Sequence, residues 1–178
     1  MEQILAFLKN PYFVQGIGIV GMAVSLMPYH FKEYNKVVLL RMAAELIFGF
    51  QFLLLGAYTG MATNFAAVGT NSVYRYRINH GKPTRIFQVL FSLLFIVLGV
   101  VTWAGPVSLL VIAAKLLSTI AFGINNTKTI RIMNMAIQPL WLVYDIVVFS
   151  IGGMIADALA IVSVTSAFFR LDVKKQSE

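Results

Sequence analysis

The sequence contains no cysteine, few charged side chains and only two histidines among its 178 residues. Without cysteine, disulfides, thiolate catalysis and cysteine-bound metals are excluded. Charged residues make up 12% of the chain and hydrophobic residues 59%, against about 25% and 45–50% in soluble domains. A soluble globular protein is therefore excluded. No apolar run shows the strict alternation of a membrane β-strand, which argues against a barrel.

The chain also lacks the residue patterns of a catalytic or metal centre. His30 and His80 stand at or near polar loops, and no H-x-x-x-H or paired-carboxylate spacing occurs. The segment Gly16–Gly21 matches G-x-G-x-x-G, but it lies inside an apolar run without the strand that a dinucleotide loop requires. We therefore expect no enzyme, no metal and no cofactor.

What the chain does contain is a series of seven apolar runs. Their lengths are close to the 17–25 residues that a hydrocarbon layer of about 30 Å requires of a spanning helix. The sequence thus predicts an all-α, polytopic membrane protein with seven transmembrane helices. The predicted spans are Pro11–Tyr29, Val38–Gly56, Ala57–Tyr76, Ile86–Trp103, Pro106–Ile124, Ile132–Phe149 and Gly153–Arg170.

The net charge of +7 is distributed in a way that indicates topology. Twelve of the fourteen Lys and Arg residues fall at alternate joints between the runs and at the C-terminal end: Lys32, Lys36, Arg41, Arg75, Arg77, Lys82, Arg85, Lys128, Arg131, Arg170, Lys174 and Lys175. The positive-inside rule then places the N-terminus outside and the C-terminus in the cytoplasm. Nucleic acid is not expected as a partner, whereas the lipid bilayer is.

The first and last segments have no span of their own. Met1–Asn10 is apolar enough to lie along the outer interface, and Pro11 stands where a helix begins, since its missing N–H costs nothing there. No positive n-region or cleavage site precedes the first span, so we expect it to be retained. Residues 172–178 form a polar cytoplasmic tail.

The chain aligns with itself at a shift of 93 residues, without a gap, over residues 16–77 and 109–170. Ser25 falls on Ser118 and Asn64 on Asp157. We interpret the single membrane domain, residues 1–178, as two parallel three-helix repeats, 12–77 and 106–171. The linker helix 84–104 restores the orientation between them, which gives a 3+1+3 plan.

Particular stretches of the chain resemble a known family. The pattern S-x-x-x-aromatic followed by a Lys- or Asn-rich turn closes the first helix of each repeat. With the stretches LLLGAYTG and LLSTIAFGINNTKTIRI, it resembles the YgjV-type bacterial inner membrane proteins. More distantly, the 3+1+3 plan is similar to the SWEET sugar transporters and the PnuC vitamin-precursor transporters. Only the second repeat has a Gln-Pro pair, Gln138-Pro139, so a SWEET-type gate is not implied.

Apart from the basic residues grouped with the joints, four charged residues lie within the predicted spans: Glu45, Lys115, Asp145 and Asp157. Each costs about 2.5–3.5 kcal/mol near the bilayer centre, so each is a candidate functional residue. Two alternatives remain open. Asp157 would also fit as a cap of the last helix, and Lys115 as a structural ion-pair partner of Glu45 or Asp145. Proton coupling through Asp145 or Glu45 is a further hypothesis.

Helical spacing groups these charges with other polar side chains. Gln138, Trp141 and Asp145 share one face of the sixth span, and Lys115 and Ser118 share one face of the fifth. Pro139 interrupts the hydrogen-bond ladder of the sixth span, either as a simple kink or as part of a site. The predicted substrate-binding residues are Lys115, Ser118, Gln138, Trp141 and Asp145, with Asn64 and Asp157 nearer the outer mouth.

The sequence thus predicts a transporter or facilitator of a small polar solute, whose identity is left open. A homo-oligomer is left open as well. The first alternative is a non-catalytic interaction or adaptor subunit, whose polar groups bind another membrane protein. The second is a membrane enzyme or lipid-binding protein that acts near the basic loops.

Overall fold

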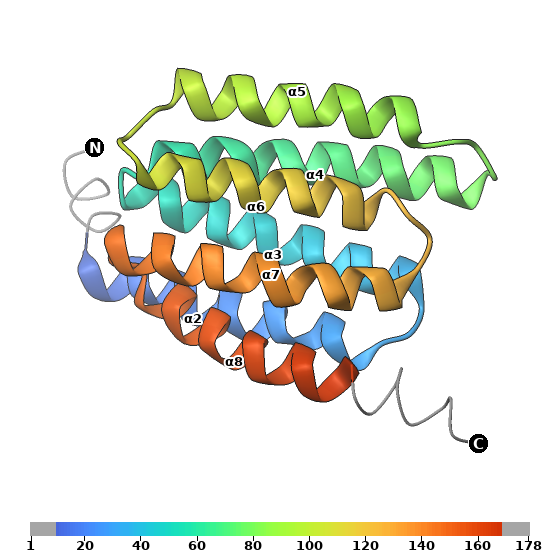
Figure 1. The fold of residues 1–178 in the computed structure, drawn as a ribbon. Helices are drawn as coiled ribbons and strands as arrows, with labels where there is room; N and C mark the ends of the chain where they lie inside the picture. The colour runs from blue at the N-terminus through green and yellow to red at the C-terminus, as the bar shows by residue number, and fades with distance from the viewer. Residues whose placement is uncertain (1–9, 169–178) are drawn as a thin grey trace.

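The computed structural model describes residues 10–168 and is all-helical over that range. Each of the seven predicted spans corresponds to one α-helix (Figure 1). The Met1–Asn10 interfacial segment apart from Asn10, Arg170 and the tail 172–178 lie outside the described residues. The elements are α2 (Pro11–Leu26), the 3-10 turn η1 (Met27–His30), α3 (Tyr34–Leu54), α4 (Tyr58–Asn79), α5 (Arg85–Val101), α6 (Val107–Phe122), α7 (Thr127–Val147) and α8 (Ile151–Phe168).

Local sequence accounts for where the helices begin. The side chain of Asn10 accepts a hydrogen bond from the Tyr12 amide, and Pro11 opens α2 as predicted. Asn126 caps α7 in the same way, by accepting from the Lys128 and Thr129 amides. These caps satisfy N–H groups that have no partner inside the helix.

Two helices begin earlier than the apolar runs predicted. α3 begins at Tyr34 instead of Val38, and α7 at Thr127 instead of Ile132. The polar first turns of these two segments are helical as well, because the backbone hydrogen bonds of a helix form outside hydrocarbon as they do within it. Arg41 and Arg131, which the sequence analysis assigned to loops, therefore lie within helices.

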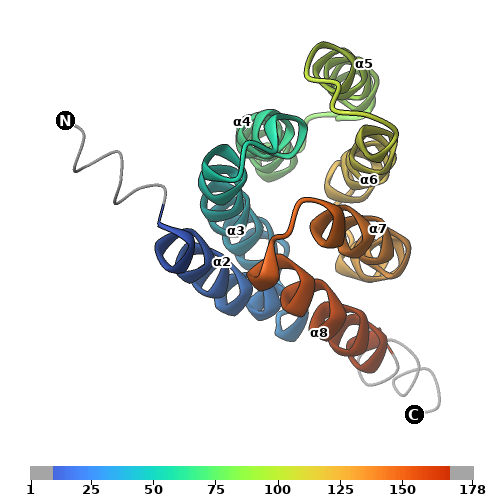
Figure 2. The ribbon, with the colours of Figure 1, turned by 90° about the vertical axis from the view of Figure 1, so that its left-hand side faces the viewer.

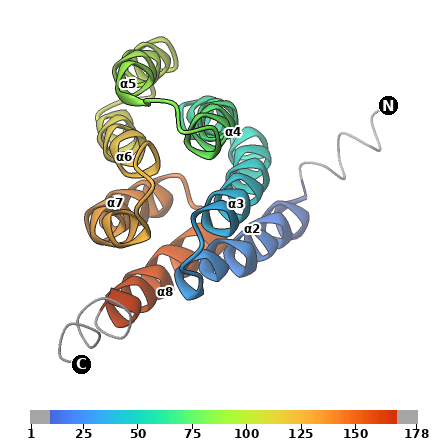
Figure 3. The same cartoon turned by 90° about the vertical axis from the view of Figure 1, so that its right-hand side faces the viewer.

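Six of the helices form a ring. Seen along the helix axes, α2, α3 and α4 follow one another along one side, and α6, α7 and α8 along the other (Figure 2). The ring closes where α2 packs against α8 and where α4 contacts α6. α5 lies outside, against α4 and α6, as the opposite view also shows (Figure 3). The interior of the ring is therefore lined by both halves of the chain.

The α3/α4 and α7/α8 joints have the same backbone geometry. Gly56 and Phe149 both have a positive φ, 71° and 59°. In the first joint the Ala57 amide donates to the Phe52 carbonyl at 2.8 Å, and in the second the Ser150 amide donates to the Asp145 carbonyl at 2.9 Å. Both are helix C-terminal turns closed through a left-handed residue. Each of these residues in the first joint lies 93 positions before its counterpart in the second.

Not every helix meets a membrane-span criterion of length and composition. Within the described residues, Pro11–His30, Tyr34–Leu54 and Ile151–Phe168 are long and apolar enough to span. α5 and α6 are apolar but shorter, at 17 and 16 residues. α4 and α7 have the length, at 22 and 21 residues, but carry many polar side chains. These polar side chains lower the mean hydropathy of the two helices, and many of them are buried inside the ring.

Candidate functional site

A cavity lined by polar and aromatic residues lies inside the ring of helices, and the space free of atoms in and around it, open solvent included, is about 420 Å³. We call it the central cavity. Its walls come from α2, α3, α4, α7 and α8, so both halves of the chain contribute. The lining residues are Ser25, Arg41, Ala44, Glu45, Phe48, Phe52, Asn64, Gln138, Trp141, Asp145, Asp157 and Ala160.

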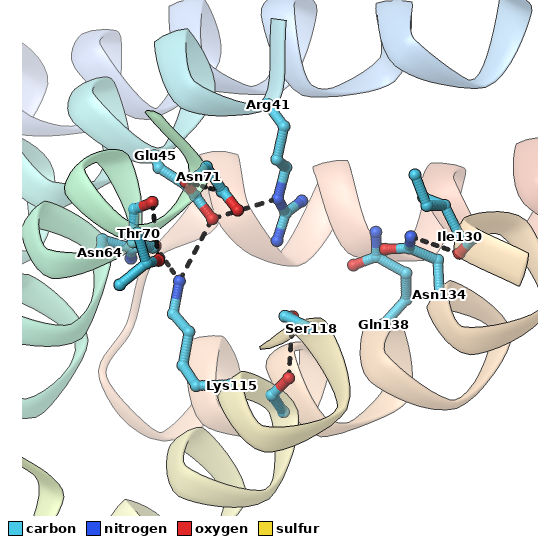
Figure 4. A network of polar contacts seen from close by, with 12 residues as sticks. Arg41, Glu45, Asn64, Thr70, Asn71, Lys115, Ser118, Ile130, Asn134 and Gln138 are labelled. Atoms are coloured by element: carbon cyan, nitrogen blue, oxygen red, sulfur yellow. Dashed lines mark hydrogen bonds and ion pairs between the residues drawn. The ribbon is translucent and has the colours of Figure 1, made fainter. Parts of the chain in front are cut away.

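Glu45 is the centre of a buried network beside this cavity (Figure 4). Its Oε1 lies 3.4 Å from Lys115 Nζ and 3.5 Å from Arg41 Nε. Asn71 Nδ2 donates to its Oε2 at 2.9 Å. Lys115 Nζ also donates to Asn64 Oδ1 at 2.9 Å. Of the two partners that the sequence left open for Lys115, the structure places Glu45 beside it, and the ammonium ties α6 to α3 and α4.

Trp141 packs into a cluster of aromatic rings next to Lys115. Its ring stacks on Phe52 with centroids 6.0 Å apart, meets Tyr144 edge-on at 5.6 Å, and lies 5.2 Å from Lys115 Nζ. An ammonium at this distance from an indole is attracted by the ring quadrupole. The ring faces are thus occupied by protein, while the buried indole Nε1 has no hydrogen-bond partner within the described chain. Trp141 therefore offers the cavity a donor.

Asp145 and Asp157 bring their carboxyl groups within hydrogen-bonding reach of each other. Asp145 Oδ1 and Asp157 Oδ2 are buried, and neither atom has a partner in the described part of the molecule. Asp157 does not cap a helix, because α8 begins at Ile151, six residues earlier. The capping alternative for Asp157 is therefore wrong, and the residue faces the central cavity.

Gln138 joins α7 to the end of the first helix. Its side-chain amide donates to the Tyr29 hydroxyl in a buried contact. Pro139 lies inside α7, and the helix continues across it to Val147. Because proline has no N–H, the Met135 carbonyl has no backbone donor from residue 139.

Most residues predicted from sequence meet at the central cavity. Gln138, Trp141, Asp145, Asn64 and Asp157 line it directly, together with Glu45. Lys115 stands behind this wall, in contact with Asn64, Glu45 and Trp141. Ser118 is not brought to the cavity, because its hydroxyl donates to the Ala114 carbonyl one turn earlier in the same helix. This bond is the common one for serine inside a helix.

Sequence reasoning missed several residues of the wall. Arg41 was grouped with the loop charges, yet its side chain is only 13% exposed and it pairs with Glu45 one turn away. The i,i+4 spacing of Arg41 and Glu45 was the signal that could have revealed it. Phe48 and Phe52 gave no signal, since aromatic residues in an apolar run are expected on any face. Ser25 was noted only as a repeat landmark.

A second cavity, with about 340 Å³ of atom-free space in and around it, open solvent included, adjoins the central one at the end where α3 and α7 begin. It shares Ser25 and Arg41 with the central cavity. Its other lining residues are Pro28, Tyr29, Val37, Phe122, Thr127, Ile130, Arg131 and Asn134. Arg41 and the Tyr29–Gln138 contact therefore stand between the two spaces.

The opposite end of the ring is tightly closed. Ser150 Oγ donates to Gln51 Oε1 at 3.1 Å, and Gln51 in turn donates to Gln15 at 3.3 Å. Nearby, the backbones of α2 and α8 come so close that a Cβ on Gly152 would lie 2.2 Å from the Gly18 carbonyl carbon. α2 and α8 therefore pack backbone against backbone at this end.

The ring of helices, with large apolar side chains exposed on its outside and polar, charged side chains buried within, defines an integral membrane protein of the helical class. A family model described as "Bacterial inner membrane protein", Imp-YgjV, matches residues 12–175. The chain therefore belongs to this family of bacterial inner membrane proteins, as the resemblance noted above implied. Comparison of the chain with curated proteins gives no match, and comparison with solved structures gives none either.

Proposed function

We propose that this inner membrane protein binds a small polar solute in the central cavity and carries it across the membrane. The observation that carries the proposal is the composition of the cavity wall. Eight of its twelve lining residues form four pairs separated by 93 positions: Glu45 with Gln138, Phe48 with Trp141, Phe52 with Asp145, and Asn64 with Asp157. The two halves of the chain thus meet at this space through corresponding positions.

This pairing also supports the 3+1+3 plan. In this plan the helices α2, α3 and α4 correspond, in order, to α6, α7 and α8. The contact between α2 and α8, which closes one side of the ring, then corresponds to the contact between α6 and α4, which closes the other. The matching backbone of the joints at Gly56 and Phe149 is a second, independent support. In such parallel repeats the site lies at the repeat interface, and rocking of one unit against the other gives access from alternate sides.

The chemistry of the wall favours a solute with several hydrogen-bonding groups. Trp141 offers an unpartnered donor and Asp145 an unpartnered acceptor, both buried. Unsatisfied groups in a membrane interior are costly, so a solute that pairs with them gains affinity. The second cavity and the closed end at Gly152 suggest a state that opens toward the end where α3 begins. By the positive-inside rule we infer that this end faces the cytoplasm.

The first test is a thermal-shift screen of the detergent-purified protein against sugars, sugar acids, nucleosides, vitamins and amino acids. A ligand present at 100 times its Kd stabilises the folded state by about 2.7 kcal/mol. We expect one class to raise the melting temperature, and Gln138→Ala and Trp141→Phe to reduce the effect. Thr165→Ala is the matched control, because among the described residues its hydroxyl bonds to the Ile161 carbonyl of its own helix and to no other group.

Uptake of the same compound into proteoliposomes completes the test. Transport by the wild type and the Thr165→Ala control, with loss in Gln138→Ala, would support the proposal. Absence of any ligand response from folded protein would contradict it. That result would favour the alternative, a non-catalytic interaction subunit in which the Glu45 network only holds the helices together.

A further inference from the structure

The acidic residues of the central cavity fall into two groups with opposite bonding. Glu45 has both oxygens engaged, by Lys115 and Arg41 on one side and by Asn71 on the other. Its charge is therefore compensated inside the protein. Over residues 10–168, the ion pairs of Arg41 and Lys115 both go to Glu45, and neither cation pairs with an aspartate.

The second group, Asp145 with Asp157, has no ion pair of this kind, although the charge of Arg41 acts on Asp157 across the same cavity. The two carboxyl groups are within hydrogen-bonding reach of each other, and each retains a buried oxygen that has no partner among the described residues. Asp145 is only 3% exposed. Its Oδ2 sits over Gly153, 1.8 Å from the point where a Cβ would be, so the absence of a side chain there makes room for the carboxylate.

Two ionised carboxylates in contact cannot both persist in a water-poor interior, since their repulsion and desolvation disfavour the doubly charged state. The pair must hold a positive charge, either a proton or another cation. The unpartnered Asp145 and Trp141 atoms lie in the wall of the same cavity, next to Phe52. A ligand here would meet an acidic pair, an indole N–H and aromatic rings together.

We propose that Asp145 and Asp157 form a subsite for a monovalent cationic group, which replaces the proton that the two carboxyls otherwise share. The group is either an alkali metal ion or the protonated amine of the solute. This proposal rests on the proposed function, because it takes the central cavity as the solute site. A divalent ion fits less well, because Glu45 is already paired with Arg41 and Lys115, and within the described residues no three His, Cys, Asp or Glu side chains are arranged so that they could hold a metal ion.

The test measures melting temperature of the purified full chain at mildly alkaline pH and constant ionic strength. LiCl, NaCl and KCl probe the metal-ion source, and methylammonium and ethanolamine chlorides probe the amine source. Tetraethylammonium chloride, which has no N–H, is the baseline, and ethylene glycol is the neutral counterpart of ethanolamine. We expect one arm to raise the melting temperature of the wild type above that baseline.

Variants then locate the effect. Asp145→Asn and Asp157→Asn should each weaken the apparent affinity about tenfold or more, because a charge-assisted contact is lost. Gly153→Ala should weaken it as well, with both carboxylates still present, since its methyl group displaces Asp145. Glu33→Gln is the matched control: this acid is 56% exposed and pairs with Lys36 at the surface. It should respond like the wild type.

Equal melting temperatures in all salts and amines would overturn the subsite, and would indicate that the carboxyl pair binds a proton only. A cation response that persists in both aspartate variants would overturn it too. A third outcome is that a neutral solute binds, that Gln138→Ala weakens its binding, and that no cation raises the melting temperature. This outcome would contradict the cation subsite and still support the proposed function. A cation response without any solute response would support the subsite and contradict solute binding.

Discussion

At the scale of single residues, the buried ammonium of Lys115 has the most consequential contacts in the molecule. It bonds to Glu45 and Asn64 and lies on the Trp141 ring, with almost no exposure. Removing one partner of a buried pair leaves the other charge uncompensated. Lys115 therefore holds α6 to α3 and α4 through charge, directly behind the wall of the cavity.

Lys115→Met should consequently lower the free energy of unfolding by about 3–5 kcal/mol. Lys36→Met is the control, since its pair with Glu33 is more than half exposed and is worth at most about 1 kcal/mol. Unfolding in mixed micelles measures both. The double variant Lys115→Met with Glu45→Gln should recover part of the loss, because both charges are then absent. Similar small losses in the two single variants would contradict this account.

At the scale of elements, the contact between α2 and α8 depends on the lack of side chains. A Cβ at Gly152 would lie within 2.6 Å of three backbone atoms of Gly18. Small residues that allow close backbone approach are a general feature of packed membrane helices. This contact closes the end of the ring at which α2 begins.

Gly152→Ala should therefore destabilise the protein by about 1–3 kcal/mol, as overpacking does, or else force α2 and α8 apart. Gly16→Ala provides the matched control on α2, because nothing lies within 4 Å of its Cβ position. It should leave stability unchanged or raise it by up to about 1 kcal/mol, since alanine favours helix over glycine. The melting temperatures of the two purified variants decide the matter. A lowered melting temperature for Gly16→Ala, together with an unchanged one for Gly152→Ala, would contradict this account of the α2/α8 contact.

At the scale of the whole molecule, the odd number of described helices places the start of α2 and the end of α8 at opposite ends of the bundle (Figure 1). The basic residues Lys32, Lys82 and Lys128 lie near one end. The positive-inside rule then predicts an outer N-terminus and a cytoplasmic C-terminal end.

The native chain has no cysteine, so a single introduced cysteine reports this topology directly. Ala104→Cys, in the α5/α6 joint, should react with a membrane-impermeant maleimide on intact cells. Lys82→Cys, in the α4/α5 joint, should react only after permeabilisation. Both side chains are exposed, so access and not burial decides the result. The opposite labelling pattern would reverse the predicted orientation.

Much of the cavity could be anticipated because it follows from local rules. Gln138, Trp141 and Asp145 recur on one helical face, and charges inside apolar runs are rare enough to stand out. Arg41 escaped notice because the apolar run of its helix begins only three residues before it, although α3 itself begins at Tyr34. Ser118 was included because it shares a face with Lys115, but helical phase does not determine whether a hydroxyl bonds across to a neighbour or back to its own helix.

By itself, the sequence determined the helical class, the number of helices and the family, since length, hydropathy and short-range spacing act within single segments. Only the tertiary structure decided which charged side chains pair with one another. Lys115 could have paired with Asp145 as well as with Glu45 on sequence grounds, and its choice of Glu45 leaves the two aspartates together. That choice depends on how six helices close into a ring, because contacts between segments far apart in the chain are set by packing and not by local spacing.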